Sequence, residues 1–406
     1  MSEWKEYKLI DITEPIKDTY IPNGSENLCY IGLEHIEQGT LRLNGIGKST
    51  DVTSNKFLFK SNDVFFGKLR VYFRKVIKPD FDGIRSTDIW VLRAKEGINQ
   101  NFLFYFLANW DFVNLADDGE GGTRMPRADW NFLKNTVWNV PPFSEQKSIA
   151  SILSSLDDKI DLLHRQNATL EKMAETLFRQ WFIEEAKEEW ESRPLSSIAN
   201  FLNGLACQKF PPKNDIEKLP VLKIKELNSG ISENSDWATT EVNPEYIVKN
   251  GDVIFAWSAS LMVKIWDGQD CILNQHLFKV TSEYYPKWFY YLWCKYHLDE
   301  FIVKAASHAT TMGHIKRSDL DEAMVLIPSD KELEEMTLEV EPLISKIINN
   351  NKQIKLLVNL RDILLPKLMS GEIRVESHRD ETSVETNNDT ATLSPVGAAF
   401  KTIKHG

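Results

Sequence analysis

The sequence contains few cysteines, and none of them stands in a metal-binding pattern. Cys29, Cys207, Cys271 and Cys294 lie far apart and form no Cys-x-x-Cys pair. We therefore expect neither a zinc site nor a disulfide framework, but small buried side chains in a reducing compartment. Long apolar runs are also missing, because no run reaches the ~18 residues of a membrane helix. The first residues lack the basic stretch and apolar core of a signal peptide. These absences predict a cytoplasmic protein that has no membrane partner.

The sequence contains partial matches to nucleotide-binding and catalytic motifs, and each match lacks a required residue. GIGKST has Arg42 where a phosphate-binding loop needs its first glycine, and GEGGT is followed by Arg124 where a dinucleotide fingerprint needs its third. VPPF resembles the Asn/Asp-Pro-Pro-aromatic element of amino-methyltransferases, but Val140 replaces the residue that accepts from the target amine. A proline-rich helix entry is the better interpretation. No nuclease-like carboxylate cluster or paired histidine spacing is found. We predict a non-catalytic chain that needs no metal and no cofactor.

Positive charge is scarce overall but locally concentrated. The net charge of −11 argues against a protein that coats nucleic acid non-specifically. Between Leu41 and Lys95, however, twelve basic residues oppose five acidic ones, a local charge of +7 that could face phosphates. Residues 189–329 contain 14 basic and 18 acidic residues, so their charge is −4. If nucleic acid is the ligand, we expect a partner protein to supply much of the positive surface.

The second half of the sequence repeats the first. In the first half, short apolar runs such as CYIGLEHI (29–36), DVFFGKL and DIWVLRA predict strands, and the longer run 101–115 predicts a helix. Counterparts such as VLKIKEL (221–227), DVIFAW and HLFKV follow in the same order, at offsets of 186 to 190 positions. Equal order at a near-constant offset predicts the duplication of one α+β unit.

Each half ends in a segment with heptad spacing. Mostly apolar residues recur at steps of 4 and 3, as in a helix that buries one stripe against a partner helix. The first stripe comprises Ile149, Leu153, Leu156, Ile160, Leu163, Asn167, Leu170, Ala174, Leu177 and Trp181; the second, 187 positions later, comprises Met336, Val340, Leu343, Ile347, Asn350, Ile354, Leu357, Arg361, Leu364 and Leu368. A helix over residues 144–183 would span ~60 Å and could hold two globular units apart.

The two long helices are expected to pair with each other. Asn167 and Asn350 lie near the middle of their stripes, so an antiparallel pair brings them together. A parallel pair in the duplication register would oppose Asn167 to Ile354 and Asn350 to Leu163. That arrangement leaves more buried polar groups without a hydrogen-bond partner. We therefore predict an antiparallel coiled coil with the globular units at opposite ends, related by an approximate two-fold axis. The alternative is that each helix only covers its own domain.

These patterns predict an α+β protein with two globular domains and two long helices. The first domain covers residues 1–143 and the second 189–329, whereas the helices cover 144–188 and 330–373. Pro342 and Pro366 each remove an amide from the second helix, which is therefore expected to start late or kink near the first and to end early near the second. The polar tail 374–406 has no periodicity and is predicted to be disordered.

Polar and basic residues gather at three matching places in the two domains. These places are the segments after the DVFF and DVIF runs, then IRSTDIW and LNQHLF, then GGTRMPRAD and ATTMGHIKRSD. Arginine suits guanine or phosphates, and asparagine or glutamine can bind adenine at two atoms. The same composition is also typical of a solvated hairpin. The candidate DNA-binding residues are Lys68, Arg70, Arg74, Lys75, Arg85, Thr87, Arg124 and Arg127, and in the second domain Trp257, Ser258, Lys264, Asn274, Gln275, His276, Thr310, Thr311, His314, Lys316 and Arg317.

With these features in this order, the chain resembles the specificity subunit of type I restriction-modification systems over roughly residues 1–375. The residues that carry the resemblance are the DVFF and DVIF strands, LNQHLF, the Thr-x-Met loops at 123–125 and 310–312, PPFSEQKSIASILSSLDDKID and LLPKLMSGEIRV. The chain departs from the pattern at Glu332 and Leu333, where the first helix has Glu145 and Gln146, and at Pro342.

The resemblance implies two target-recognition domains, each reading one half of a bipartite double-stranded DNA target, and a helix pair whose length sets the unread spacer. It also implies that two methyltransferase subunits dock on this chain, with motor-nuclease subunits added for restriction. Two rival functions stay open. One is a protein–protein scaffold built on a coiled coil without a DNA role. The other is an active methyltransferase, although the sequence has no cofactor-binding glycine motif.

Overall fold

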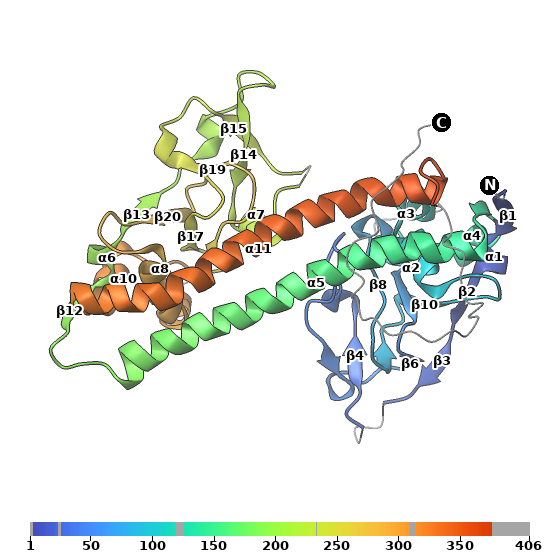
Figure 1. Ribbon diagram of the computed structural model, residues 1–406, viewed down its shortest axis with the longest axis horizontal. Coiled ribbons are helices and arrows are strands. Elements are labelled where there is room, and N and C mark those ends of the chain that lie inside the picture. Colours follow the sequence, from blue (N-terminus) through green and yellow to red (C-terminus); the bar gives the residue numbers. More distant parts are fainter. Residues whose placement is uncertain (1–2, 23–25, 119–125, 233, 308–312, 376–406) are drawn as a thin grey trace, which may run out of the picture. The chain divides into compact units, whose positions relative to one another are not determined.

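The computed structural model describes residues 3–22, 26–118, 126–232, 234–307 and 313–375 (Figure 1). The chain divides into two compact units, one comprising the described residues within Met1–Ser151 and Leu368–Gly406 and the other those within Ile152–Lys367. The predicted tail lies outside the described residues from residue 376 onwards. No helix in the part of the chain that the structure describes has both the length and the apolar content to cross a membrane.

The strands of the two units follow one another in a similar order. Those of the first unit are β1 (Lys5–Lys8), β2 (Thr13–Ile16), β3 (Asp18–Tyr20), β4 (Cys29–Ile31), β5 (Gly47–Lys48), β6 (Lys56–Phe59), β7 (Val64–Gly67), β8 (Val76–Ile77), β9 (Gly83–Arg85), β10 (Ile89–Ala94) and β11 (Val137–Val140). Those of the second are β12 (Glu191–Pro194), β13 (Asn200–Asn203), β14 (Lys218–Leu222), β15 (Trp237–Thr239), β16 (Ile247–Val248), β17 (Val253–Ala256), β18 (Met262–Ile265), β19 (Cys271–Leu273), β20 (Leu277–Thr281) and β21 (Met324–Ile327).

The sheets confirm the predicted duplication of an α+β unit. A sheet of order β2-β10-β7-β8 in the first unit matches β13-β20-β17-β18 in the second. A further sheet, β5-β4-β9-β6-β3, matches β15-β14-β19-β16 over its first four strands, and each of these two sheets contains a parallel pair, β4 with β9 and β14 with β19. The central strands β7 and β17 are buried along their whole length, as expected from their unbroken apolar sequences.

Two of the predicted strands continue as helical turns. Within 29–36, Leu33–His35 form a 3₁₀ turn, and within 221–227 the residues from Ile224 onwards belong to α7 (Ile224–Ser229). The parallel pairs with β9 and β19 join only two residues of each run, after which the chain leaves the sheet. Apolar content alone predicted longer strands because it does not report where the pairing partner ends.

Two helices stand where one is predicted at 101–115. α2 (Gln100–Ala108) and α3 (Trp110–Asp118) meet at Asn109, and the second unit repeats this corner at His297, between α8 (Lys287–Tyr296) and α9 (Leu298–Ser307). Both corner residues are buried and bonded: Asn109 Nδ2 donates to Asp111, and His297 Nε2 lies 3.0 Å from the Met324 carbonyl oxygen. The shorter helices are α1 (Leu9–Ile12), α4 (Trp130–Leu133), α6 (Leu195–Ile198) and α10 (Arg317–Glu322).

The two long helices pair in opposite directions within the second unit. α5 (Phe143–Arg179) continues through a π-helical turn, Gln180–Glu184, and α11 spans Asp330–Ser370. Asn167 accepts a hydrogen bond of 2.9 Å from Asn350 and donates one of 2.6 Å to Asn351. Arg361 Nη1 lies 2.9 Å from Asp157 Oδ1. Later residues of one helix therefore face earlier residues of the other, and the predicted approach of Asn167 to Asn350 is confirmed.

Every residue of the two predicted stripes is buried or half-buried. Ile160, Leu163 and Ile354 form a closed apolar cluster between the helices. The buried face is wider than predicted, because Phe178 and Ile344 also lie in the core, on the side that packs with α8.

The expectations of a late start near Pro342 and of an early end near Pro366 are wrong, whereas a kink at Pro342 stays a prediction. α11 begins at Asp330, before Pro342, and ends at Ser370, beyond Pro366. Val340 and Ile344 on either side of Pro342 are buried in the core, as are Leu365 and Leu368 beside Pro366. Burial of these apolar side chains, each worth roughly 1.5–3 kcal/mol, offsets the cost of about 3 kcal/mol for an internal proline.

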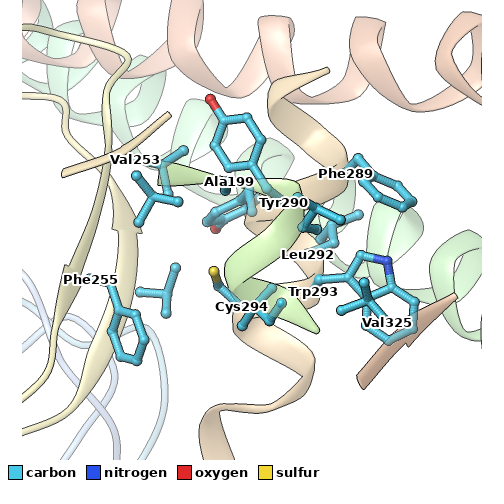
Figure 2. Close-up of a cluster of buried hydrophobic side chains, with 14 of the residues drawn as sticks. Ala199, Val253, Phe255, Phe289, Tyr290, Leu292, Trp293, Cys294 and Val325 are labelled. Atoms are coloured by element: carbon cyan, nitrogen blue, oxygen red, sulfur yellow. The ribbon is translucent and has the colours of Figure 1, made fainter. Parts of the chain in front are cut away.

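α8 forms the centre of the largest core in the second unit. Trp288, Phe289 and Cys294 are completely buried, which fits a helix that is apolar on nearly all sides. Figure 2 shows α8 beside Val253 and Phe255 of β17. The same cluster contains residues of α5 and α11, so the helix pair and the sheet share one core.

The prediction of buried cysteines is confirmed for three of the four. Cys207, Cys271 and Cys294 are buried and free, and burial raises the pKa of the Cys271 thiol to about 12. The prediction is wrong for Cys29, which is exposed. It is the first residue of β4 and the one residue of that strand that is exposed.

One carboxylate near the start of each long helix has the same set of partners. In the first unit, Glu145 accepts from Trp4 Nε1 (3.2 Å) and from Arg374 (2.7 and 2.9 Å). In the second unit, Glu332 accepts from Trp190 Nε1 (3.1 Å) and is paired with Lys187. Hydrogen bonds from Lys187, Ser329 and Trp190 lower the pKa of Glu332 to about 2. The duplication thus extends to the side chains that attach each helix to its globular unit.

We predict that Glu332→Gln lowers the thermal midpoint at neutral pH by roughly 2 °C, since it removes a charged partner of Lys187. The pKa of this carboxyl is depressed from 4.5 to about 2 on folding, so its contribution is complete above pH 4.5 and is lost as the pH falls towards 2. The midpoints of variant and parent should therefore converge in acid. The matched control is Glu335→Gln on the same helix, whose carboxylate is 3.8 Å from Lys331 and exposed. A midpoint difference for Glu332→Gln that did not change between pH 7 and pH 2 would contradict this account.

Candidate nucleic-acid interface

In the first unit, the three predicted places converge on one surface. The Lys68 amide donates to the Asp88 carbonyl (2.9 Å), and the Ala128 amide donates to the Lys68 carbonyl (2.8 Å). Leu69 and Arg127 form an isolated antiparallel bridge. The turn after β7, the turn before β10 and the segment around Arg127 are therefore tied together through the backbone.

This first recognition cluster, defined as Lys68, Arg70, Thr87 and Arg127, is predominantly cationic. Arg70, Thr87 and Arg127 are exposed, and Lys68 is half-buried. Burial lowers the pKa of the Lys68 ammonium group, and the positive charges of nearby Arg127, Arg85 and Lys17 act in the same direction, against Asp88. Mutual repulsion among these cations is relieved when an anion binds, which suits contact with phosphates.

The second unit brings the same three places together. The Ala259 amide donates to the Gly313 carbonyl (2.8 Å), the Ile315 amide donates to the Trp257 carbonyl (3.0 Å), and Ser258 and His314 form the bridge that corresponds to Leu69 and Arg127. The Trp257 amide donates to the His276 carbonyl (3.4 Å). Two independent copies of the sequence thus build the same junction.

The second recognition cluster, defined as Trp257, Gln275, His276 and His314, is aromatic and carries no fixed charge. The Trp257 ring centroid lies 5.9 Å from that of His276 and 6.3 Å from that of His314. Trp257 Nε1 donates to Asn203 Oδ1 (3.1 Å) and so holds the indole in place. Amide and imidazole groups can both donate and accept, which suits base edges better than phosphates.

Both junctions contain a strained residue at the same position. Arg70 has φ 54° and Ala259 has φ 58°, although neither is glycine. Each directly follows the residue that forms the isolated bridge. Such conformations cost about 1–2 kcal/mol and tend to occur where a function requires them.

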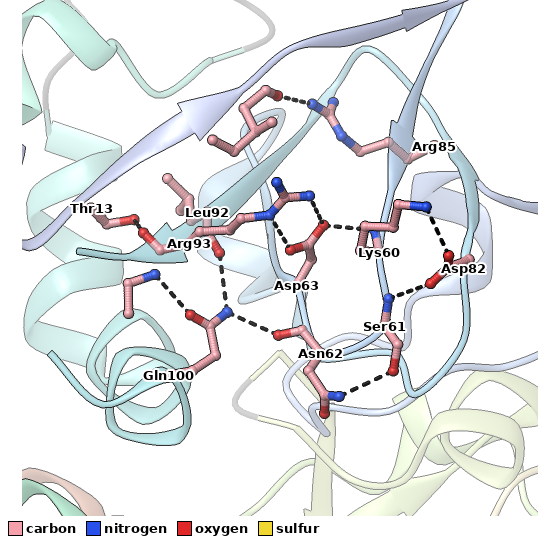
Figure 3. A network of polar contacts seen from close by, with 12 residues as sticks. Thr13, Lys60, Ser61, Asn62, Asp63, Asp82, Arg85, Leu92, Arg93 and Gln100 are labelled. Atoms are coloured by element: carbon pink, nitrogen blue, oxygen red, sulfur yellow. Dashed lines mark hydrogen bonds and ion pairs between the residues drawn. The ribbon is translucent and has the colours of Figure 1, made fainter. Parts of the chain in front are cut away.

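Two of the predicted DNA-binding arginines are structural instead. Arg74 and Arg85 are each only 2% exposed. Arg74 Nε donates to the Ala108 carbonyl (2.7 Å). Arg85 donates to the carbonyls of Ile16 (2.7 Å) and Ile89, and burial lowers its pKa to about 10. Figure 3 shows Arg85 near the Asp63–Arg93 ion pair, inside the domain. The sequence could not separate these arginines from exposed ones because all share the same strand-and-turn context.

The prediction that Asn274 and Ser258 contact DNA is also wrong, because both side chains are buried. Asn274 Oδ1 accepts from the His276 amide (3.3 Å), and Ser258 Oγ lies 3.2 Å from His276 Nδ1. They therefore position His276 and are not open to a ligand.

Three other predicted residues bind carbonyl groups of their own unit. Lys75 donates to Leu33, Lys264 to Leu227 (3.3 Å) and Arg317 to Phe201 (3.1 Å). Lys316 is exposed. Arg124, Thr310 and Thr311 lie outside the described residues.

The sequence interpretation missed Asn203 and Lys17. Asn203 ends β13 beside Trp257, and Lys17 follows β2, the matching strand of the first unit. The signal was the Asn-Gly pair after the FL run: a Cβ at Gly204 would lie 2.3 Å from the Asn274 carbonyl oxygen, so the chain needs glycine there.

Within the described residues, no group of three histidine, cysteine or acidic side chains is placed to hold a metal ion. The expectation that the chain needs no metal and no cofactor stays a prediction.

The sequence and the fold of this chain are similar to those of known DNA specificity subunits. A family model described as type I restriction modification DNA specificity domain matches residues 1–172 and 187–359. The chain is 30% identical over 310 residues to the type I restriction enzyme MjaIX specificity subunit of Methanocaldococcus jannaschii, covering 70% of this chain and 71% of that protein. It is 20% identical to the HindI specificity subunit of Haemophilus influenzae, covering 92% and 100%. In fold it is similar to the crystal structure of a type I restriction-modification S subunit from M. genitalium, with a TM-score of 0.53 and 14% identity, over 90% of this chain and 96% of that one.

We predict that Arg85→Ala destabilises the chain by about 2–4 kcal/mol, because it leaves buried carbonyl groups without their donor. Arg127→Ala should change stability by less than about 0.5 kcal/mol, since Arg127 is exposed and its ion pair with Asp88 is 3.4 Å long. Urea denaturation of both variants beside the parent chain measures the difference. Equal losses for the two variants would refute the assignment of Arg85 as structural and Arg127 as a surface residue.

Proposed function

This chain belongs to the type I restriction-modification DNA specificity family, and we propose that each of its two recognition clusters contacts one half of a bipartite DNA target. As a specificity subunit, the chain selects the sequence on which the restriction-modification enzyme acts. We propose that it is itself non-catalytic and that the chemistry resides in partner subunits. The scaffold and methyltransferase alternatives are not favoured.

The observation that carries this proposal is the repeated junction with different side chains. The bridges Leu69–Arg127 and Ser258–His314 stand at matching positions of matching loops. The side chains around them are cationic in one unit and aromatic and amide-bearing in the other. A duplicated frame with divergent outward residues is what two readers of different half-sites require.

We propose that α5 and α11 form an antiparallel coiled coil that sets the spacer between the two half-sites. The domain limits then follow the sequence expectation: recognition domains at 1–143 and 189–329, and helices at 144–188 and 330–373. Contacts from residue 157 to residue 167 of α5 support continuous pairing. An approximate two-fold relation between the domains and their placement at opposite ends of the rod belong to the same proposal.

We further propose that two methyltransferase subunits dock on the helices, with motor-nuclease subunits joining them for restriction. Leu356, Leu360 and Ile363 support a docking role, because they follow one another along one face of α11 and are 71%, 43% and 59% exposed. An apolar stripe of this kind on a helix of a soluble assembly is expected to meet a partner.

We predict that Gln275→Ala with His276→Ala changes the specificity at one half-site only, by about 1–3 kcal/mol per base pair contacted. The matched variant, Lys68→Ala with Arg127→Ala, should affect the other half-site and lower the salt slope of binding by about 2. Methylome sequencing of cells that express each variant with its methyltransferase partner identifies the altered half. Modular reading would be refuted if either pair of substitutions altered both halves together.

We predict that removing one heptad from both helices, residues 159–165 and 352–358, shortens the spacer by about three base pairs. The deletion keeps Asp157 with Arg361 and Asn167 with Asn350, while it removes ~10.5 Å of rod at 1.5 Å per residue, against 3.4 Å per base pair. Methylome sequencing again measures the result. A control that deletes the heptad only from α5 should mismatch the polar pairs and abolish modification. An unchanged spacer in the double deletion would refute the spacer role.

A further inference from the structure

We propose that the polar residues in the seam between α5 and α11 determine which helices pair, favouring α5 with α11 of one chain over like-with-like pairing between two chains. The residues concerned are Asp157 and Asn167 on α5, and Asn350 and Arg361 on α11. This inference does not depend on DNA recognition.

Because the two long helices arose as copies of one another, each could pair with its own kind as well as with the other helix. The two stripes repeat at an offset of 187 positions and are similar in their apolar residues. An antiparallel pair of two α5 helices, or of two α11 helices, would therefore bury nearly the same apolar side chains as α5 with α11. Hydrophobic burial alone does not distinguish these pairings, because it is not directional.

In the observed register, each of the four polar seam residues has at least one polar partner across the seam, although Asn350 Oδ1 accepts no hydrogen bond from the described residues. Facing residues have numbers that add up to 517 or 518, as in Asn167 with Asn350 and Asn351 and Asp157 with Arg361. Asn350 is 0% exposed and Arg361 is 1% exposed, so both depend on these partners. Polar seam residues of this kind are known to select register and partner in coiled coils, at some cost in stability.

Like-with-like pairing in the corresponding register would leave the same residues without polar partners. Between two α11 helices, Arg361 would face Leu343 or Ile344, and Asn350 would face Ile354. Two buried guanidinium groups and two buried amides would then lose the partners that they have across the seam, and each Arg361 would keep Asp362 of its own helix.

Pairing of two α5 helices would also leave polar residues without partners. Asp157 would face Ala174, and Asn167 would face Leu163. The position that corresponds to the ion pair is occupied by Ala174 and Ile344, both buried and apolar. The ion pair therefore breaks the internal symmetry of the seam and has no duplicate.

The test uses the full chain with Cys29→Ser, which removes the exposed thiol. Ile347→Cys with Leu357→Cys reports like-with-like pairing, because these residues face each other only between two α11 helices. Leu163→Cys with Ile354→Cys reports the observed pairing, because these side chains are in contact in one apolar cluster. Mild oxidation, gel analysis under non-reducing conditions and native mass spectrometry give the readout.

We expect the parent chain to be monomeric, with only the 163–354 disulfide, formed within one chain. Asn350→Leu with Arg361→Leu should tighten dimerisation roughly a hundredfold and yield the 347–357 disulfide between chains. The matched control, Leu343→Ala with Leu364→Ala, loses apolar packing on α11 and should lower stability without that disulfide. Arg361→Lys keeps the charge and should behave like the parent.

The proposal is overturned if the leucine variant stays monomeric with the 163–354 disulfide alone. A dimer that carries the 163–354 disulfide between chains, without the 347–357 product, would overturn it as well, since such a dimer exchanges unlike helices. The 347–357 product in the parent chain would have the same consequence.

Discussion

Burial of one apolar face of α5 and α11 is the constraint on which the second unit depends. Each helix must cover two partners with that face: the other helix and α8. Because α8 also packs on β17 and β20, the core is continuous from the helix pair to the sheet. Trp257 packs against the end of this same core. Trp257, which we propose contacts DNA, is thus held by the hydrophobic centre of the unit, as suits a site that needs fixed geometry.

The duplication separates what supports the fold from what reads the target. The sheets, the helix corners at Asn109 and His297, and the Glu145 and Glu332 contacts appear once in each unit. The side chains at the two junctions differ, since they are cationic in one unit and aromatic in the other. A strained backbone at Arg70 and at Ala259 persists in spite of that divergence. Strain kept at both copies of a loop indicates that the loop geometry itself is needed, whichever side chains it presents.

The sequence predicted the three places, but neither their convergence nor all of the residues that face outwards there. Lys68, Arg127, His276 and His314 lie at the junctions as expected. Arg85, three residues before Asp88, is buried and binds backbone carbonyls. In a strand, neighbouring residues point to opposite faces, so an error of one position exchanges a structural side chain for a recognition one. The late helix start expected at Pro342 was wrong for another reason. The local preference of proline against helix is outweighed by the burial of apolar residues around it.

By itself, the sequence determined the duplication, the two long helices and the stripes that they bury, because hydrophobic spacing is a property of consecutive residues. The asparagine positions further indicated that the helices run in opposite directions. Tertiary structure alone decided which arginines are buried, that Asn203 holds Trp257, and that Asp157 meets Arg361 across the seam. These facts depend on partners many residues away in the chain, and the burial and bonding of a polar side chain are set by those partners and not by its sequence neighbours.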